Sequence, residues 1–336
     1  MTQTTGPSRT RKYAFAAATI AAALGLSAPA ADAADNYILC GGSPGGLWSL
    51  LGAGLDAVVK AEDPNAAVTY QTSSGGFANI VQIKSGKCDL AIAHVGEAVM
   101  AAKGVEPFPA PVDGFAAVAV LYDWAPMQWI ADKAWAEENG IVSLADLAAK
   151  KPEMDLVVNR RGILPSILAE RSLELSGTSF EDIESWGGSV QFAGSKSAAQ
   201  IMTDRKADVW VNAMFIGGSR IRGITDVRET TLLSVPAEVT AQMAEEFGSM
   251  PWTVKADAYD WLDGDVETFG ARAVLLISSD ADPAKVEALT AMILKHTDKV
   301  QNVHKAMAPF GGALMSSLQD VPYHPGAAAA YKAAGL

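Results

Sequence analysis

The segment from Ile38 to Trp48 constrains the fold of this chain more than any other. An apolar run over 38–40 leads through the turn GGSPGG (residues 41–46) into a stretch rich in Leu, Ala and Gly. A strand that feeds a helix through glycines leaves free backbone N–H groups at the positive end of the helix dipole. The segment therefore predicts an α/β fold, with a turn suited to a carboxylate or phosphate.

Strand-like and helix-like runs alternate beyond this turn, as expected of a parallel sheet with helices on its faces. The predicted strands are 37–40, 67–71, 89–94, 155–158, 190–193, 208–213, 230–235 and 266–278. The predicted helices are 47–60, 77–84, 165–175, 198–204, 283–295 and 326–336. Ligands of open α/β sheets lie beyond the carboxyl ends of the strands, so loops 41–46, 73–76 and 94–96 should line one crevice.

The first 33 residues have the parts of a secretory signal peptide. Arg9, Arg11 and Lys12 precede an apolar stretch over 13–26, and small residues stand at the cleavage position around Ala33. The apolar stretch is shorter than the about 20 residues that a membrane-spanning helix needs. We expect residues 1–33 to be cleaved and the mature protein to be exported to the periplasm.

The length of the mature chain favours two lobes, since about 300 residues fit two better than one. The apolar runs 115–122 and 126–131 mark the crossing from one lobe to the other. We expect 34–122 together with 266–336 to form lobe 1, and 123–265 to form lobe 2.

The chain is acidic, with a formal net charge of −12. Cleavage of the leader removes three basic residues and one acidic residue, which takes the net charge to −14. A protein of this charge is not expected to bind nucleic acid or an anionic membrane. Attraction for an anionic ligand must then come from a few local groups.

The two cysteines, Cys40 and Cys88, stand at the end of one predicted strand and before the start of another. In parallel neighbours those ends lie more than about 10 Å apart, whereas a disulfide needs Cα atoms within about 7 Å. We therefore expect two buried free thiols.

The turn also matches the G-x-S-x-G pattern of hydrolases, with Ser43 as the nucleophile. That chemistry uses the N–H of the next residue as an oxyanion donor, and Pro44 has no N–H. A secreted serine esterase is therefore disfavoured, and we expect no enzyme activity. A tight turn without any ligand is the other simple interpretation.

Polar residues follow the next two predicted strands of lobe 1. Ser74, Gly75 and Asn79 stand at the start of a helix, where they can cap it or hold a ligand oxygen. His94 ends a strand at the expected crevice, where it can be a structural residue or a ligand contact.

In lobe 2, Arg160 and Arg161 follow the strand 155–158. Arginine binds carboxylates through two hydrogen bonds, although most exposed arginines contact only solvent. Trp210 and Asn212 lie on the strand 208–213, where core packing is the alternative to ligand binding. No metal-binding motif is present, so we expect neither a metal nor another cofactor.

A series of five segments in this order identifies a protein family more specifically than any single segment does. They are GGSPGGLWSLLGAGL (41–55), TSSGGFANIVQIKSGKCDLAIAH (72–94), SKSAAQIMTDRKADVWV (195–211), DVETFGARAVLLIS (265–278) and YHPGAAAAYKAAGL (323–336). Together they resemble the solute-binding subunits of tripartite ATP-independent periplasmic (TRAP) transporters of the TAXI family. The resemblance implies a two-lobed, type II-like periplasmic binding protein, each lobe a mainly parallel sheet flanked by helices, with the solute in the cleft. Known ligands of that family are mostly carboxylates, including glutamate.

This chain departs from the family pattern at four places. Trp48-Ser49-Leu50 stands where family members often have Tyr-Tyr-Pro, and His94-Val95-Gly96 where they tend to have Gln-Ser-Asp. Residues 160–165 replace a glycine-serine loop, and residues around 214–216 replace a Gly-x-Pro. The scaffold is kept while the pocket walls differ, so the resemblance does not assign glutamate as the ligand of this protein.

The resemblance implies a periplasmic receptor that captures a small organic anion and delivers it to TRAP membrane subunits. We expect a monomer and a partly apolar or aromatic acid. A periplasmic sensor that reports its ligand to a membrane kinase would have the same fold, and the sequence does not separate the two. The residues expected at the ligand are Gly42, Ser43, Gly45, Ser74, Gly75, Asn79, His94 and Asn212, with Arg160 or Arg161 neutralising a carboxylate and Trp48 and Trp210 as apolar walls.

Overall fold

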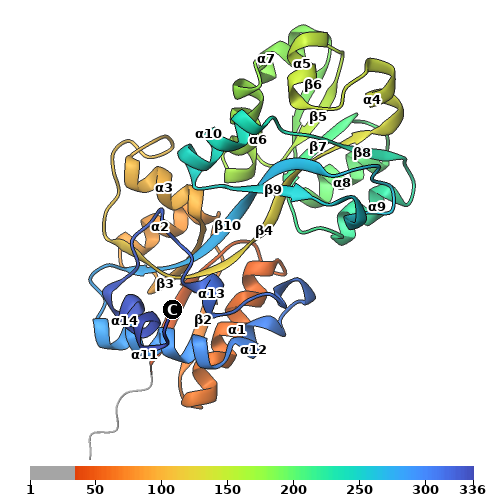
Figure 1. Cartoon of the computed structure of the whole chain (residues 1–336). Helices are drawn as coiled ribbons and strands as arrows, with labels where there is room; N and C mark the ends of the chain where they lie inside the picture. Colours follow the sequence, from red (N-terminus) through yellow and green to blue (C-terminus); the bar gives the residue numbers. More distant parts are fainter. Residues whose placement is uncertain (1–34) are drawn as a thin grey trace, which may run out of the picture. The chain divides into compact units, whose positions relative to one another are not determined.

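Two long antiparallel strands, β4 (Phe115–Asp132) and β10 (Val266–Ser278), run through the middle of the sheet. They belong to a computed structural model that describes residues 35–336, so the expected leader lies outside the described residues. β4 has 18 residues and spans about 60 Å at about 3.3 Å per residue. Figure 1 shows both strands passing from one group of elements to the other. The two apolar runs expected at the crossing are thus one continuous strand.

On one side of this pair, three parallel strands follow the predicted alternation. β1 (Asn36–Cys40) lies between β2 (Ala67–Gln71) and β3 (Leu90–His94), and β3 pairs with β10. The helices of this part are α1 (Leu47–Glu62), α2 (Gly76–Lys84), α3 (Val95–Lys103), α11 (Pro283–Lys295), α12 (Thr297–Gln301), α13 (Gly312–Met315) and α14 (Pro325–Ala333), with the 3₁₀ turn η2 (Lys305–Met307).

On the other side, the sheet continues in the order β4-β7-β5-β6. β5 (Asp155–Val158), β6 (Ser189–Phe192) and β7 (Val209–Ala213) are parallel to one another. β8 (Thr230–Leu233) pairs with β4, and β9 (Met250–Val254) pairs with β10. The helices of this part are α4 (Lys133–Asn139), α5 (Leu144–Lys150), α6 (Leu164–Leu175), α7 (Phe180–Ser185), α8 (Ser195–Thr203), α9 (Ser219–Thr225) and α10 (Ala237–Phe247), with the 3₁₀ turn η1 (Ala256–Ala258).

The expected fold class, a two-lobed α/β structure with helices on the faces of the sheet, is confirmed. The sheet is parallel toward its two ends and antiparallel in the middle, because β4 and β10 run against their neighbours. The lobe boundaries stay a prediction. Short helices such as α4, α5 and α7 were not expected, since six or seven residues show too little periodicity to be recognised.

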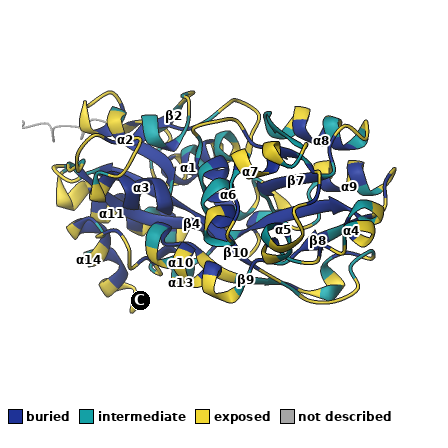
Figure 2. Cartoon of the chain, turned by 90° about the horizontal axis from the view of Figure 1, so that it is seen from above, coloured by how far each residue is buried: buried dark blue, intermediate teal, exposed yellow. Residues whose placement is uncertain are grey.

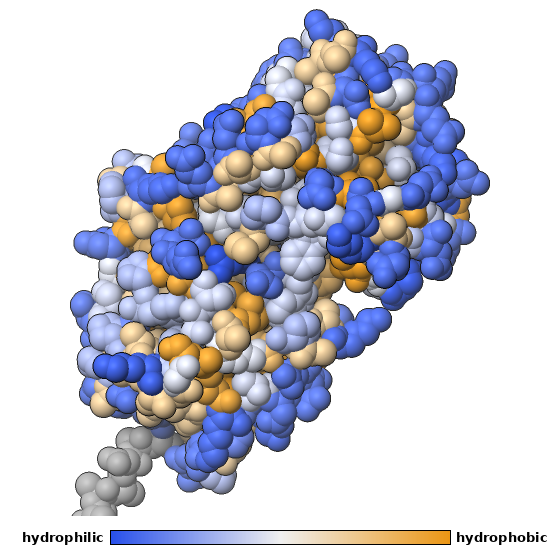
Figure 3. Space-filling model, in the orientation of Figure 1, coloured by the Kyte–Doolittle hydropathy of each residue, from blue (hydrophilic) through white to orange (hydrophobic). Residues whose placement is uncertain are grey.

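Burial follows the layers of this fold. In Figure 2 the strands are mostly dark blue, and the yellow residues lie on the outer helices and loops. The face drawn in Figure 3 is largely hydrophilic, with hydrophobic residues in scattered patches. None of the helices within residues 35–336 is long and apolar enough to cross a membrane.

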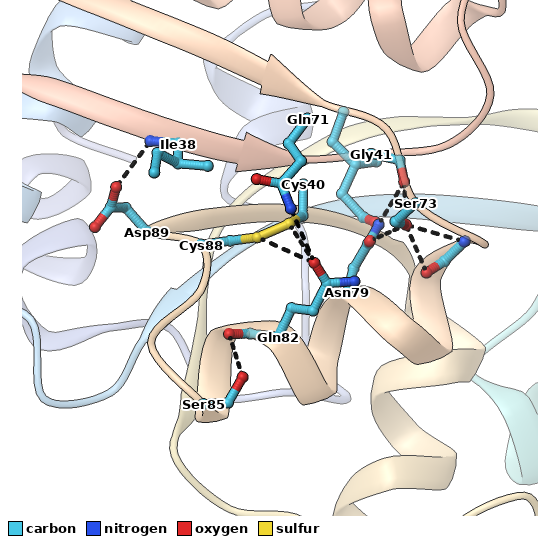
Figure 4. Close-up of a disulfide and its surroundings, with 12 residues drawn as sticks. Ile38, Cys40, Gly41, Gln71, Ser73, Asn79, Gln82, Ser85, Cys88 and Asp89 are labelled. Atoms are coloured by element: carbon cyan, nitrogen blue, oxygen red, sulfur yellow. Dashed lines mark hydrogen bonds between the residues drawn. A yellow bond between two sulfur atoms is a disulfide. The ribbon is translucent and has the colours of Figure 1, made fainter.

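Cys40 and Cys88 form a disulfide, so the expectation of two free thiols is wrong (Figure 4). Their Cα atoms lie 5.9 Å apart, within the usual span of a disulfide. The physical reason is the stagger between β1 and β3. Cys40, the last residue of β1, pairs with Ala91 near the start of β3. Cys88 is therefore only three residues before the partner of Cys40, and the chain bends at Lys87 and Asp89 instead of continuing the strand, which brings the two cysteines together.

A second link joins the same strand ends through the carbonyl oxygen of Gly41 (Figure 4). Ser73 Oγ donates to this oxygen across 2.5 Å, and Asn79 Nδ2 donates to it across 3.1 Å. Asn79 Nδ2 also donates to the carbonyl of Ile92 in β3, across 2.7 Å. Asn79 is fully buried. Its amide thus holds the ends of β1 and β3 together.

Mass spectrometry of the denatured, unreduced protein should show no alkylated cysteine. Reduction should lower the free energy of unfolding by about 2–4 kcal/mol, because the bridge joins residues 48 apart in sequence. Urea unfolding with and without a reductant measures this, and the Cys40→Ala/Cys88→Ala double variant, insensitive to reductant, is the control. Two alkylated thiols in the unreduced wild type would contradict the bridge.

In the absence of ligand, Asn79→Ala should lower the free energy of unfolding by about 2–3 kcal/mol, because it removes the buried hydrogen bonds to the carbonyls of Gly41 and Ile92. Ser74→Ala is the matched control. Ser74 is exposed in the same loop, so its truncation should change stability by less than about 0.5 kcal/mol. Equal unfolding midpoints for the two variants would show that Asn79 does not link the strands.

Candidate functional site

A cavity of about 610 Å³ lies beyond the carboxyl ends of β1 and β7, where ligands of α/β sheets are expected. Its volume is in the range of small-molecule sites. The right side of Figure 3 shows the surface hollowed between α9 and the segment after α12. The lining consists of residues 45–47 and 50, Tyr122, Ala125, Ser195, Lys196, residues 212–222 and residues 304–306.

Four basic side chains line this cavity, and none of its lining residues, all within the described range, is Asp or Glu. They are Lys196, Arg220, Arg222 and Lys305. Arg222 donates to the carbonyl of Gly217. The other three have no ion-pair partner among residues 35–336. In a chain with a net charge of −12, this local excess of positive charge suits an anion.

Sequence reasoning missed these four side chains, although two of them had a signal. Gly194-Ser195-Lys196 and Gly218-Ser219-Arg220 repeat one pattern at the starts of α8 and α9. A small residue followed by a basic residue at a helix start is common, and only the fold shows that both starts face one cavity. Lys305 comes from a segment far away in sequence and carried no local signal.

Helix starts at the cavity lack side-chain caps. α1, α8 and α9 have Gly46, Gly194 and Gly218 as N-cap residues, without a capping hydrogen bond. By contrast, the side chains at the starts of α4, α7, α11 and α14 accept hydrogen bonds from backbone N–H groups. First-turn N–H groups without a cap are available to water or to a bound oxygen.

The start of the glycine turn is fixed by a hydrogen bond, and the rest of the turn is exposed. The N–H of Gly42 donates to the Tyr70 hydroxyl across 2.7 Å, so this group is already used. Ser43 is exposed, and no hydrogen bond joins it to a histidine or a carboxylate within residues 35–336. Gly45 lines the cavity with φ +74°, in the left-handed region that favours glycine, and a Cβ there would meet nothing within 4 Å. The exposed part of the turn therefore begins after Gly42.

Polar side chains tie the strand ends of lobe 2 beneath the cavity. Asn212, at the end of β7, lines the cavity and donates to Ser195 Oγ across 3.0 Å. Asn159, after β5, donates to Asn212 Oδ1 across 2.9 Å. Asn212 is thus one of the expected residues that the structure places at the cavity, and its amide has a fixed orientation.

Other expected residues lie off the cavity. Arg160 and Arg161 are exposed and outside the lining. The Arg161 guanidinium carbon lies 3.8 Å from the centroid of the Phe192 ring, a cation–π contact. Trp210, expected as an apolar wall, is fully buried in the core with residues of α8 and α9, and it lies outside the cavity lining. It shares a face of β7 with Asn212 but lies deeper in the strand.

Ser74 and Gly75 also lie outside the lining. The N–H of Gly75 donates to Ser73 Oγ across 3.1 Å, within the loop that holds Gly41. Asn79 is buried by the same loop, as described above. These three expected residues therefore support the turn from behind and do not line the cavity.

Trp48 and His94 contact each other behind the cavity. Their ring centroids are 5.0 Å apart, and Trp48 Nε1 donates to the Tyr122 hydroxyl across 3.1 Å. The Glu97 carboxylate accepts the His94 backbone N–H across 2.7 Å, at the start of α3. Neither Trp48 nor His94 lines the cavity, whereas Tyr122 does. Burial raises the pKa of Tyr122 to about 12, so its hydroxyl keeps its proton.

The arrangement can bind and orient an anion. No three side chains of His, Cys, Asp or Glu within the described part of the chain lie close enough to hold a metal ion. Leu47, Leu50 and Phe215 add apolar surface to the basic lining. Such a cavity can hold the acidic group and the apolar body of one small molecule.

Several solved structures of binding proteins are similar to this chain. PhnD1 from Prochlorococcus marinus (MIT 9301), in complex with methylphosphonate, has a TM-score of 0.51 and 12% identity over 79% of this chain and 89% of its own. MatC from Rhodopseudomonas palustris with bound malate has a TM-score of 0.49 and 13% identity, over 82% and 88% of the two chains. The alkanesulfonate-binding protein SsuA from Xanthomonas axonopodis pv. citri, bound to MOPS, has a TM-score of 0.47 and 14% identity, over 90% and 92%. At 12% identity, the similarity to PhnD1 shows the fold alone.

The family comparison is more specific than these structural similarities. No curated protein matches the chain. The model of the NMT1-like family matches residues 39–335, a range that includes the glycine turn, the whole cavity lining and most of the C-terminal segment. The protein therefore belongs to the NMT1-like family.

Proposed function

We propose that this protein is a periplasmic receptor, without enzyme activity, that captures a small organic acid and delivers it to a TRAP-type membrane transporter. The observation that carries the proposal is the charge of the cavity lining, with four basic side chains and no acidic one. An organic anion in this cavity gains attraction that the net negative charge of the protein does not supply.

The rest of the lining supports an organic acid. The uncapped starts of α1 and α8 offer hydrogen-bond donors to its oxygens. Leu47, Leu50 and Phe215 offer apolar surface to its carbon skeleton. This combination supports the partly apolar or aromatic acid expected from the sequence.

The lining disfavours amino acids as ligands. An α-ammonium group in this cavity would meet four basic side chains and no carboxylate within the lining. A buried charge without a partner is costly, and a charge of the same sign nearby adds to that cost. We infer that the ligand has no ammonium group, in contrast to glutamate.

Transport is favoured over the alternatives by separate observations. The five segments that resemble TRAP solute-binding subunits support delivery to a TRAP-type transporter. An esterase would need a base next to Ser43, and the described residues supply no such hydrogen bond. Delivery predicts that neighbouring genes encode TRAP membrane subunits, whereas a neighbouring membrane kinase without them would favour the sensor.

Matched pairs of ligands test the proposed class. Glutarate should raise the melting temperature of the protein, and L-glutamate, which adds only an ammonium group, should not. Phenylacetate and L-phenylglycine, which again differ only by the ammonium group, form a second pair with an aromatic body. Thermal-shift titration at constant ionic strength measures all four. If neither acid shifts the melting temperature, or if the amino acids shift it more, the proposal is wrong.

Substitutions test which arginines serve the ligand. Arg220→Ala should weaken the affinity for the acid by about 1.5–3 kcal/mol, because it removes a charged hydrogen-bond donor from the cavity. Arg161→Ala is the matched control, since Arg161 packs on Phe192 outside the lining, and it should leave the affinity unchanged. Isothermal titration calorimetry gives both values. If only Arg161→Ala loses affinity, the acid binds at the loop 160–165 and not in the cavity.

A further inference from the structure

Tyr122 lies on β4 where the cavity meets the glycine turn and the loop after β7. It is only 6% exposed, yet it lines the cavity. Its hydroxyl oxygen accepts a hydrogen bond from Trp48 Nε1 across 3.1 Å. The Phe215 ring packs edge to face against it, with centroids 5.3 Å apart. Tyr122 is therefore held on two sides by aromatic residues.

Trp48 itself packs against His94, and Glu97 lies behind that histidine. Its ring lies against His94, and His94 Nδ1 lies 3.2 Å from Glu97 Oε2. Glu97 is 2% exposed. The space for its carboxylate depends on Gly76, where a Cβ would come within 1.7 Å of Glu97 Oε2. A packed series of side chains thus runs from Glu97 through His94 and Trp48 to Tyr122.

Trp48, His94 and Phe215 come from segments that are far apart in the sequence. In the structure, Trp48 contacts His94, and both Trp48 and Phe215 contact Tyr122. Residues from three distant segments thus pack as one unit, and Tyr122 lies where this unit meets the cavity.

The hydroxyl hydrogen of Tyr122 has no acceptor among the described residues. Trp48 Nε1 donates to the hydroxyl oxygen, and Tyr122 lines the cavity, so a group bound there is the candidate acceptor for the hydrogen. A buried hydroxyl gains from a partner, and leaving a buried donor unpaired is unfavourable. The raised pKa of Tyr122 agrees with this role, because the protonated form is the one that donates.

We propose that Tyr122 determines specificity by donating its hydroxyl hydrogen to an oxygen of the bound acid, and that Trp48 positions this hydroxyl. The inference rests on the proposed function, since it needs an acid in the cavity. The Phe215 ring packs against the Tyr122 ring and also lines the cavity, so we expect the recognised oxygen to be attached to an apolar body. Trp48 thus acts through Tyr122 and not as a wall of the cavity.

Calorimetry with glutarate and with phenylacetate tests this on four proteins: wild type, Tyr122→Phe, Trp48→Phe and the double variant. Tyr122→Phe should weaken binding of the tighter acid about 10- to 100-fold. Trp48→Phe keeps an aromatic ring and should weaken binding several-fold. The double variant should bind no more weakly than Tyr122→Phe, because Trp48 acts only through the hydroxyl.

Tyr37→Phe is the matched control. The Tyr37 hydroxyl is buried without a hydrogen-bond partner among residues 35–336 and lies outside the cavity lining, so its removal should leave the affinity unchanged. Melting temperatures measured without ligand identify any variant that is not folded. If Tyr122→Phe does not fold, the affinity of Trp48→Phe tests the proposal.

The outcomes separate the two proposals. Equal affinity of wild type and Tyr122→Phe overturns the role of Tyr122 and leaves the receptor function standing. Independent, additive losses in the double variant overturn the positioning role of Trp48. Absence of binding of both acids to the wild type overturns the receptor for organic acids, and the role of Tyr122 with it.

Discussion

The antiparallel pairing of β4 with β10 is the contact on which the rest of the structure depends. Both strands pass through the middle of one sheet, with β3, β1 and β2 beyond β10 and β7, β5 and β6 beyond β4. The carboxyl ends of β1 and β7 border one cavity as a result. Tyr122 lies on β4 itself, so the side chain with the free hydroxyl hydrogen is carried by the element that joins the two halves.

The cavity can bind an oxygen because a rigid part of the backbone lies next to a part with exposed N–H groups. The disulfide, Asn79 and Ser73 hold the end of β1, and Tyr70 holds Gly42. The chain after Gly42 is exposed and leads into a helix without a side-chain cap. A fixed turn with free N–H groups binds an oxygen without first losing much conformational entropy.

Local charge and overall charge have different effects in this protein. A net charge of −12 repels anions at a distance, and salt screens that repulsion beyond about 10 Å. Inside the cavity the basic side chains are close to the ligand, and screening there is weaker. Selectivity then depends on the few groups at short range. The absence of a carboxylate in the lining disfavours an ammonium group, and the Tyr122 hydroxyl favours an oxygen.

Local sequence indicated every strand except β9 and most of the longer helices, though not α3 or α10, because alternating hydrophobic runs and glycine turns act over a few residues. It also indicated Gly45 and Asn212, which follow strand ends. Tertiary structure decided the rest. The stagger of β1 against β3 brings Cys40 to Cys88, and the depth of Trp210 in β7 removes it from the cavity. The meeting of Lys196, Arg220 and Lys305, and of Trp48, His94 and Phe215 around Tyr122, joins residues from distant segments. Such contacts depend on register and on the crossing of β4 and β10, which no short stretch of sequence encodes.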